Sequence, residues 1–88
     1  MKVLNGKVNN PSGLTSRLCA ELVAEANRAS LCHIALYSHG EEADLKSIMN
    51  MMALVIRSGE EFKIEIEGPN EEEIFDKFDK LLNELKLK

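Results

Sequence analysis

The sequence predicts an α+β fold in which helices cover one face of a four-stranded sheet and the other face stays open to water. Two observations lead to this fold class. Four short segments alternate apolar and polar residues, and three other segments repeat apolar residues at helical spacing, in the order β-α-β-β-α-β-α. Because a chain of 88 residues can build only one thin core of two layers, we expect residues 1–88 to form a single domain.

A strand, a loop and a helix occupy the first third of the chain. Residues 2–8 alternate weakly and predict the first strand, and the loop Asn-Asn-Pro-Ser-Gly follows at residues 9–13. Thr15 is the natural N-cap of the next helix, because its hydroxyl can accept a hydrogen bond from a first-turn N–H group. This helix ends near residues 27–30. Its apolar stripe consists of Leu18, Cys19, Leu22, Val23 and Ala26.

A β-hairpin is predicted in the middle of the chain. Residues 31–38 alternate between apolar and polar side chains. His39 and Gly40 stand where a tight turn belongs, since glycine tolerates a positive φ. Residues 41–45 form the returning strand, and their charges indicate that one face of this strand is exposed.

Residues 46–59 predict a helical segment that is rich in isoleucine and methionine. Ser47 can cap its start, and Gly59 ends the segment. Methionine and isoleucine at helical spacing are usually core residues, but they also suit an adaptable contact surface. The apolar residues of this segment are Ile48, Met49, Met51, Met52, Val55 and Ile56.

The last strand and the last helix have the clearest patterns. Residues 61–68 alternate between inward apolar and outward charged side chains. Pro69 and Asn70 open the final helix, and Asn70 and Glu73 have the spacing of a capping box, in which each side chain bonds the other residue's N–H group. The apolar stripe of this helix consists of Ile74, Phe78, Leu81, Leu82 and Leu85.

Composition and charge exclude several classes of function. The net charge of −4 argues against a nucleic-acid partner, because phosphate backbones are bound by clustered basic surfaces. There is neither an apolar run long enough for a membrane helix nor a signal peptide, so we expect no membrane insertion and a cytoplasmic location. Cys19 and Cys32 form no disulfide framework or metal pattern and are expected to be buried, and no metal or cofactor is predicted.

No arrangement of side chains specifies an enzyme. His33 lies on the polar side of a strand and His39 at a hairpin tip, and neither has a carboxylate or cysteine at metal-ligand spacing. Cys32 precedes His33, but neighbours on a strand point to opposite faces, which removes the simplest thiolate dyad. The carboxylates are explained by solvated faces, and no glycine-rich phosphate loop is present.

Two helix starts remain as candidate sites. Thr15, Ser16 and Arg17 offer free N–H groups, hydroxyls and a guanidinium, which together could hold a phosphate. Ser47 heads the methionine-rich helix, where the helix dipole would favour a phosphate on the serine hydroxyl. Each start is also explained as a plain helix cap, which is the commoner role, so neither stretch decides the function by itself.

Taken together, the two stretches are more specific. NPSGLTSRL at residues 10–18, followed by HGEEADLKSIMNMM at residues 39–52, resembles HPr, the small phosphocarrier of the bacterial phosphoenolpyruvate:sugar phosphotransferase system. The resemblance runs from about residue 2 to residue 85. It implies an open-faced β-sandwich, an antiparallel four-stranded sheet with three helices on one side, in agreement with the fold class deduced from the residue pattern.

The resemblance includes one departure at the site of the family's chemistry. In HPr, the residue after Gly-Leu is the histidine that takes phosphate from enzyme I and passes it to permease components, and here that position is Thr15. Arg17, which in the family faces the phosphohistidine, is retained, whereas Leu18 replaces the usual proline. An imidazole is a good nucleophile near neutral pH, whereas a threonine hydroxyl needs an activating base. We therefore expect that Thr15 does not carry phosphate.

The regulatory half of the family pattern is present. By resemblance, Ser47 is the target of an HPr kinase/phosphorylase, and the phosphoserine docks on a regulator such as catabolite control protein A, together with Arg17 and an apolar patch. A regulatory serine without the catalytic histidine is similar to the Crh paralogues of HPr. Asn50 departs from the glycine that is common in relatives and can extend the helix or alter the fit to a kinase. The expected patch consists of Ile48, Met49 and Met52.

Two other functions stay open on the sequence alone. A degenerate HPr domain would act as an unmodified binding module for enzyme I, permease components or another metabolic enzyme. A phosphocarrier with displaced chemistry would use His33 or His39, and it is the weakest hypothesis because both residues lie away from the loop that holds Arg17. The leading hypothesis is a regulatory protein, not an enzyme, that is controlled at Ser47.

Overall fold

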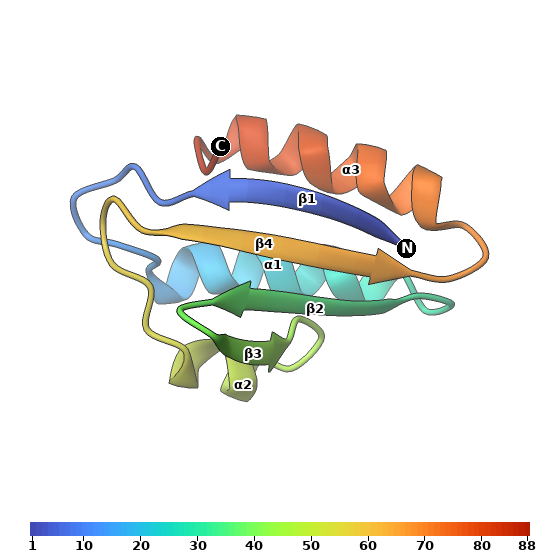
Figure 1. The fold of residues 1–88 in the computed structure, drawn as a ribbon, viewed down its shortest axis with the longest axis horizontal. Coiled ribbons are helices and arrows are strands. Elements are labelled where there is room, and N and C mark those ends of the chain that lie inside the picture. Colours follow the sequence, from blue (N-terminus) through green and yellow to red (C-terminus); the bar gives the residue numbers. More distant parts are fainter.

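Four strands and three helices make up the computed structural model, which describes residues 1–88 (Figure 1). In chain order they are β1 (Lys2–Lys7), α1 (Ser16–Arg28), β2 (His33–Ser38), β3 (Glu41–Asp44), α2 (Ile48–Ala53), β4 (Glu61–Glu67) and α3 (Glu71–Glu84). The strands form one antiparallel sheet in the order β1-β4-β2-β3, so that β1 and β3 are its edges. The element order and the open-faced sandwich predicted from the sequence are confirmed.

The central strand β4 carries the middle of the hydrophobic core. Its Ile64 pairs with Leu4 of β1 on one side and with Leu36 of β2 on the other, and all three are buried. Strand alternation also buries Phe62 and Ile66 against the helices. In Figure 1, α1 lies behind the sheet, α3 beside β1 and α2 beside β3, and no helix covers the front face.

The two long helices pack on the sheet through one apolar stripe each. α1 runs behind β4 and β2, and α3 lies along β1 (Figure 1). None of the helices is long and apolar enough to cross a membrane. The stripes predicted from helical spacing are buried in their centres and half-buried at their margins. Fully buried members are Leu18, Cys19, Leu22 and Ala26 in α1 and Ile74, Phe78 and Leu82 in α3.

The helix α2 is shorter than the sequence pattern indicates. It ends at Ala53, and Leu54 already has extended backbone dihedral angles (φ −92°, ψ 104°). Residues 54–56 then alternate, with Leu54 and Ile56 buried and Val55 exposed. A helix that continued to Gly59 could not place both Leu54 and Ile56 in the core, because residues two apart face different directions on a helix. Tertiary packing therefore ends the helix early.

The predicted capping box at the start of α3 is absent. Asn70 is the N-cap residue, but its side chain makes no capping hydrogen bond. Instead, its Oδ1 accepts a hydrogen bond from the buried thiol of Cys32 (3.1 Å). Glu71, rather than Glu73, reaches back, and its Oε1 accepts a hydrogen bond from the N–H of Gly68 (3.3 Å). The Asn70 side chain thus accepts a hydrogen bond from the Cys32 thiol in place of the capping bond from the helix.

The β2–β3 hairpin has the predicted two-residue turn. His39 and Gly40 both have positive φ angles, 56° and 75°, as a type I′ turn requires. The side chain of His33 is exposed and Cys32 is buried, which confirms that the two neighbours point to opposite faces. Cys19 is buried as well, as expected.

The C-terminal tail covers one end of the edge strand β1. The N–H of Lys7 donates to the carbonyl of Leu87 (2.7 Å), and the Leu87 side chain is fully buried. The Asn9 amide donates to the carbonyls of Lys86 and Lys88 (3.2 Å each). The first bond occupies an N–H group that the edge strand would otherwise expose, and the Asn9 bonds hold the tail in place.

Candidate functional site

The loop that precedes α1 is held in one conformation by three contacts. Gly13 has a φ of 74°, and a Cβ atom at this position would lie 2.9 Å from the carbonyl oxygen of Ile56. The same carbonyl accepts a hydrogen bond from the N–H of Leu14 (2.9 Å). On the other side, the Asn10 amide donates to the carbonyl of Gly13 (2.6 Å). The loop is therefore fixed just before Thr15, and only glycine fits at its tightest point.

Thr15 caps α1, as the sequence predicts. Its Oγ1 accepts a hydrogen bond from the N–H of Leu18 (3.3 Å). Thr15 lines a hollow of about 330 Å³ whose other lining residues are Asn10, Arg17, Leu18 and Leu85. Because this lining contains no histidine and no carboxylate, the hollow provides no base for the hydroxyl. The Asn10 Oδ1 atom is buried and has no hydrogen-bond partner.

Ser16 and Arg17 follow on the exposed first turn of α1. The guanidinium of Arg17 makes no ion pair within the chain. It is therefore available to an anionic group that approaches from outside.

Ser47 is the N-cap of α2 and is half-buried. Its Oγ accepts two hydrogen bonds from the same residue, one from the backbone N–H of Asn50 (3.2 Å) and one from the Asn50 side-chain amide (3.0 Å). The second bond requires an amide side chain, which is why Asn50 differs in effect from the glycine expected by resemblance. The two bonds occupy the acceptor sites of the hydroxyl and leave its proton free.

The start of α2 is attached to the last turn of α1. The Lys46 ammonium donates to the carbonyl of Ala29 (2.7 Å), and the Asn27 amide donates to the carbonyl of Lys46 (3.1 Å). Since the 13 residues of α1 span about 20 Å, Ser47 lies near the end of the helix opposite to Thr15 and Arg17. The two predicted helix-start sites are therefore separate places on the surface, not two halves of one phosphate pocket.

An apolar strip connects these two places. Its exposed side chains are Ile48 (42% exposed), Met49 (80%), Met52 (52%) and Val55 (68%), whereas Met51 is buried in the core. Ile56, the residue after Val55, bonds the loop that leads into α1. The structure thus exposes the three patch residues predicted from the sequence and adds Val55, which an uninterrupted helical pattern did not distinguish from the others.

His39 has a partner that the sequence did not reveal. Its Nε2 lies 2.8 Å from Oε1 of Glu60, which also accepts a hydrogen bond from the N–H of Arg57 (2.5 Å). The bond from Arg57, and next the bond from His39, hold the pKa of the Glu60 carboxyl below its ordinary value. The sequence pattern gave no sign of this pairing, because Glu60 is distant from His39 in sequence and approaches through the turn before β4.

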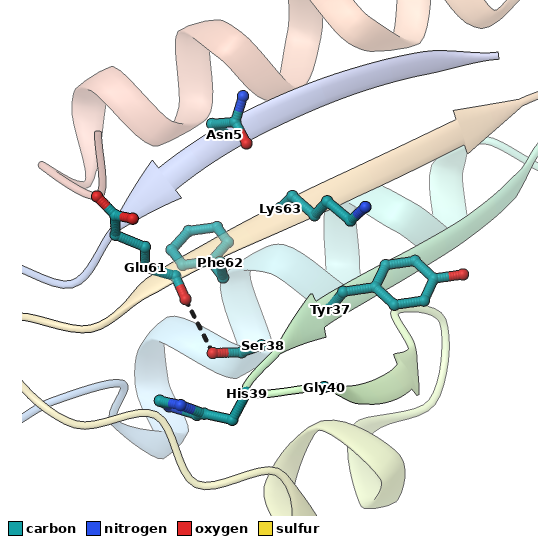
Figure 2. A pocket seen from close by; sticks show the side chains of 8 residues that line it. All are labelled: Asn5, Tyr37, Ser38, His39, Gly40, Glu61, Phe62 and Lys63. Atoms are coloured by element: carbon teal, nitrogen blue, oxygen red, sulfur yellow. Dashed lines mark hydrogen bonds between the residues drawn. The ribbon is translucent and has the colours of Figure 1, made fainter.

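The largest hollow lies elsewhere, at the turn end of the sheet. It measures about 420 Å³ and includes His39, but none of the residues of the two helix starts or of the apolar patch lines it. Figure 2 shows its side chains on neighbouring strands, with the Ser38 hydroxyl donating to the carbonyl of Glu61 (2.9 Å). No group of three or more His, Cys, Asp or Glu side chains is arranged to hold a metal ion. The lining residues are Asn5, Tyr37, Ser38, His39, Gly40, Glu61, Phe62 and Lys63.

Comparison with known proteins identifies the family. The profile described as the PTS HPr component phosphorylation site matches residues 5–84. The chain is 32% identical over 87 residues to the phosphocarrier protein HPr of Lysinibacillus sphaericus, covering 99% of this chain and 98% of that protein. It is 34% identical over 71 residues to the HPr-like protein Crh of Bacillus subtilis, covering 81% and 82% of the two chains.

Solved structures agree with the sequence matches. The histidine-containing phosphocarrier protein of a mycoplasma superposes with a TM-score of 0.90 at 26% identity, covering 98% of this chain and 97% of that one. Crh of Bacillus subtilis, described as a domain-swapped dimer, gives a TM-score of 0.70 at 32% identity and covers 89% and 88%. The chain belongs to the HPr family. It is therefore a phosphocarrier-like protein, and its relative HPr is a phosphocarrier and not a catalyst.

Proposed function

We propose that this HPr-family protein is a regulatory module that receives phosphate on Ser47 and does not carry phosphate on Thr15. The observation that supports it most directly is the position of Ser47. Its half-buried hydroxyl heads a helix whose outer face exposes Ile48, Met49 and Met52. A modification there changes the charge at the margin of an apolar contact surface, which is how phosphorylation switches an interface.

The loop around Thr15 lacks what a phosphocarrier needs. By resemblance, Thr15 stands where HPr has its phosphorylated histidine. The Thr15 hydroxyl accepts the capping bond of α1, and no base lines the hollow beside it. Without an activating base a threonine is a weak nucleophile, and a threonine phosphate ester is a poorer phosphoryl donor than a phosphoramidate. Transfer from enzyme I to this loop is therefore not expected.

The surroundings of Ser47 favour a phosphate once it is formed. The backbone N–H and the side-chain amide of Asn50 already point at Oγ, and both can donate to phosphate oxygens. The same two bonds must loosen before the hydroxyl can attack a donor phosphate. Asn50 is therefore expected to slow the modification and to stabilise its product.

The partners in this proposal come from the family resemblance. An HPr kinase/phosphorylase would modify Ser47, and a regulator such as catabolite control protein A would bind the phosphoserine together with the apolar strip. Arg17 lies at the opposite end of α1 and has no ion pair, so it would supply a second, separate contact to the same regulator. A cytoplasmic location is part of the same proposal.

Incubation with ATP and an HPr kinase tests the serine. Intact-mass measurement should show the gain of one phosphoryl group, and Ser47→Ala should abolish it. Ser16→Ala is the matched control, because Ser16 is an exposed serine at the other helix start and should leave the gain unchanged. No mass gain, or a gain that persists in Ser47→Ala, would refute the proposal.

A second function is favoured by the exposure of the strip in the unmodified chain. Met49 and Val55 are already accessible without any phosphate, so the protein would bind enzyme I, permease components or another metabolic enzyme unmodified. Pull-downs with unmodified and Ser47-phosphorylated protein separate the two functions. Equal capture of one partner by both forms favours the binding module, and capture by the phosphorylated form alone favours the regulatory module.

A further inference from the structure

A groove runs between α2 and the edge strand β3. It consists of two adjoining hollows of about 280 and 350 Å³, and Glu41 and Ala53 line both. Met49 and Val55 lie at its two ends. The remaining lining residues are Glu42, Asn50 and Leu54 in the first hollow and His39, Arg57 and Glu60 in the second.

The charges of this groove are mostly acidic. Glu41 and Glu42 form no ion pair, and Glu60 is paired only with His39. Glu41 pairs with Ser38 in the sheet register, and at this turn end of β3 its carboxylate is exposed beside α2. Arg57 is the only lysine or arginine that lines the groove. Three carboxylates against one guanidinium leave the groove with a net negative charge.

Apolar surface lies directly beside these carboxylates. Met49 is 80% exposed and Val55 is 68% exposed, and Ala53 between them carries no polar group that could keep a partner away. An exposed methionine is flexible and adapts to different apolar side chains. The groove thus combines the apolar side chains of Met49, Ala53 and Val55 with an acidic rim on its β3 side.

We propose that this groove binds a basic amphipathic segment of a partner protein, with apolar side chains against Met49, Ala53 and Val55 and a lysine or arginine against Glu41. Charge complementarity selects this occupant. Nucleic acids and anionic membranes would be repelled by the same carboxylates. A segment that carries both apolar and basic side chains can contact the apolar residues of the groove and pair with its carboxylates at the same time. The inference does not rest on phosphorylation of Ser47, which lines neither hollow.

A synthetic helical peptide tests this inference. The probe is about fourteen residues long and carries leucines on one face with lysines and arginines beside them. Titration into the isotopically labelled protein should shift the backbone amide resonances of Glu41, Met49, Ala53 and Val55. A peptide of the same pattern with glutamates in place of the basic residues should produce no such shifts.

Charge reversal in the groove gives the quantitative test. Glu41→Lys should weaken binding of the basic peptide about tenfold, since it replaces an attraction by a repulsion. Glu84→Lys is the matched control, because Glu84 is an exposed carboxylate in α3, which lies along the opposite edge of the sheet (Figure 1), and binding should change less than about twofold. Peptide binding is measured with the unphosphorylated protein, whereas the proposed function is measured as a mass gain on Ser47, so that the two ideas fail or succeed independently.

Three results would overturn the inference. One is the absence of shifts in the groove at millimolar peptide. Another is equal binding of the basic and the acidic peptide. The last is a loss of affinity that is the same in Glu41→Lys and Glu84→Lys, which would indicate attraction to the overall negative charge instead of to the groove.

Discussion

The starts of α1 and α2 have the same local structure but different surroundings. In each, a hydroxyl at the N-cap accepts a hydrogen bond from the N–H group three residues later, at 3.3 Å for Thr15 and 3.2 Å for Ser47. α1 continues for 13 residues on the core, whereas α2 has six residues and exposes most of its apolar side chains. A helix cap alone therefore does not indicate a function, and the surface around the cap determines whether it can be a functional site.

The two regions also differ in how the chain before the cap is held. The loop before Thr15 is fixed by the close approach of Gly13 to Ile56 and by the Asn10 amide. Before Ser47, a lysine side chain and an asparagine side chain attach the chain to α1. We infer that the Thr15 region keeps the fixed loop of the family without its carrier chemistry. We also infer that the Ser47 region is the surface that the protein uses.

The largest expected effect is that of Gly13→Ala on stability. The added Cβ would lie 2.9 Å from the Ile56 carbonyl at a φ of 74°, so we expect a loss of about 2–4 kcal/mol in the free energy of unfolding. Gly40→Ala is the control, because Gly40 has a similar φ of 75° but open space around it, and it should cost only about 1 kcal/mol. Urea unfolding measures both, and equal losses would mean that the loop is not fixed by Ile56.

Removal of the two caps should be unequal. Thr15→Ala should cost about 1–2 kcal/mol, since α1 contributes four buried residues to the core, and Ser47→Ala about 0.5–1 kcal/mol, since α2 contributes only Met51. Urea unfolding of both variants measures this difference. A larger loss in Ser47→Ala would show that the shorter helix is the more important one for the fold.

Asn50→Ala tests whether the Asn50 side chain restrains the hydroxyl of Ser47. This change removes the side-chain bond to the serine Oγ and keeps a residue suited to a helix. The initial rate of phosphorylation by an HPr kinase should rise about threefold, which corresponds to the loss of one exposed hydrogen bond. Asn83→Ala, on α3, is the control. A rate that is unchanged or lower would contradict a restraining role of the Asn50 amide.

The smallest effect is a pH dependence at Glu60. The Arg57 and His39 bonds hold its pKa below the ordinary value of 4.5, so the folded state binds this proton less tightly than the unfolded state. Glu60 therefore stabilises the fold above pH 4.5, and this stabilisation is lost as the pH falls through the lower pKa of the folded state. Glu60→Gln should reduce the difference in melting temperature between neutral and acidic solution. An identical pH profile for the variant would contradict the pairing.

Local patterns in the sequence predicted most of the fold. Strict alternation in β4, the glycine at position 40 and the hydroxyls of Thr15 and Ser47 each act through neighbours in the chain, and each is found as expected. The patch of Ile48, Met49 and Met52 was expected from the family resemblance and not from spacing, whereas the caps at Thr15 and Ser47 follow from local spacing. These features need no knowledge of distant contacts.

The features that the sequence did not predict depend on tertiary contacts. α2 ends at Ala53 because Leu54 and Ile56 both enter the core. Asn70 does not cap α3 because Cys32, distant in sequence, donates to its side chain. The pairing of His39 with Glu60 likewise requires the β2–β3 turn to lie close to the turn before β4. None of these partners lies within a few residues of the other, so periodicity and spacing carry no signal for them.

Mapping of phosphorylated residues after exposure to both phosphoryl sources shows whether the protein is modified on Ser47 or carries phosphate from enzyme I. The protein is incubated in parallel with an HPr kinase and ATP, and with enzyme I and phosphoenolpyruvate, and each product is digested and analysed by tandem mass spectrometry. We expect a phosphoryl group on Ser47 in the first reaction and none on any residue in the second. A phosphoryl group on Thr15, His33 or His39 from enzyme I, or an unmodified Ser47 in the kinase reaction, would contradict it.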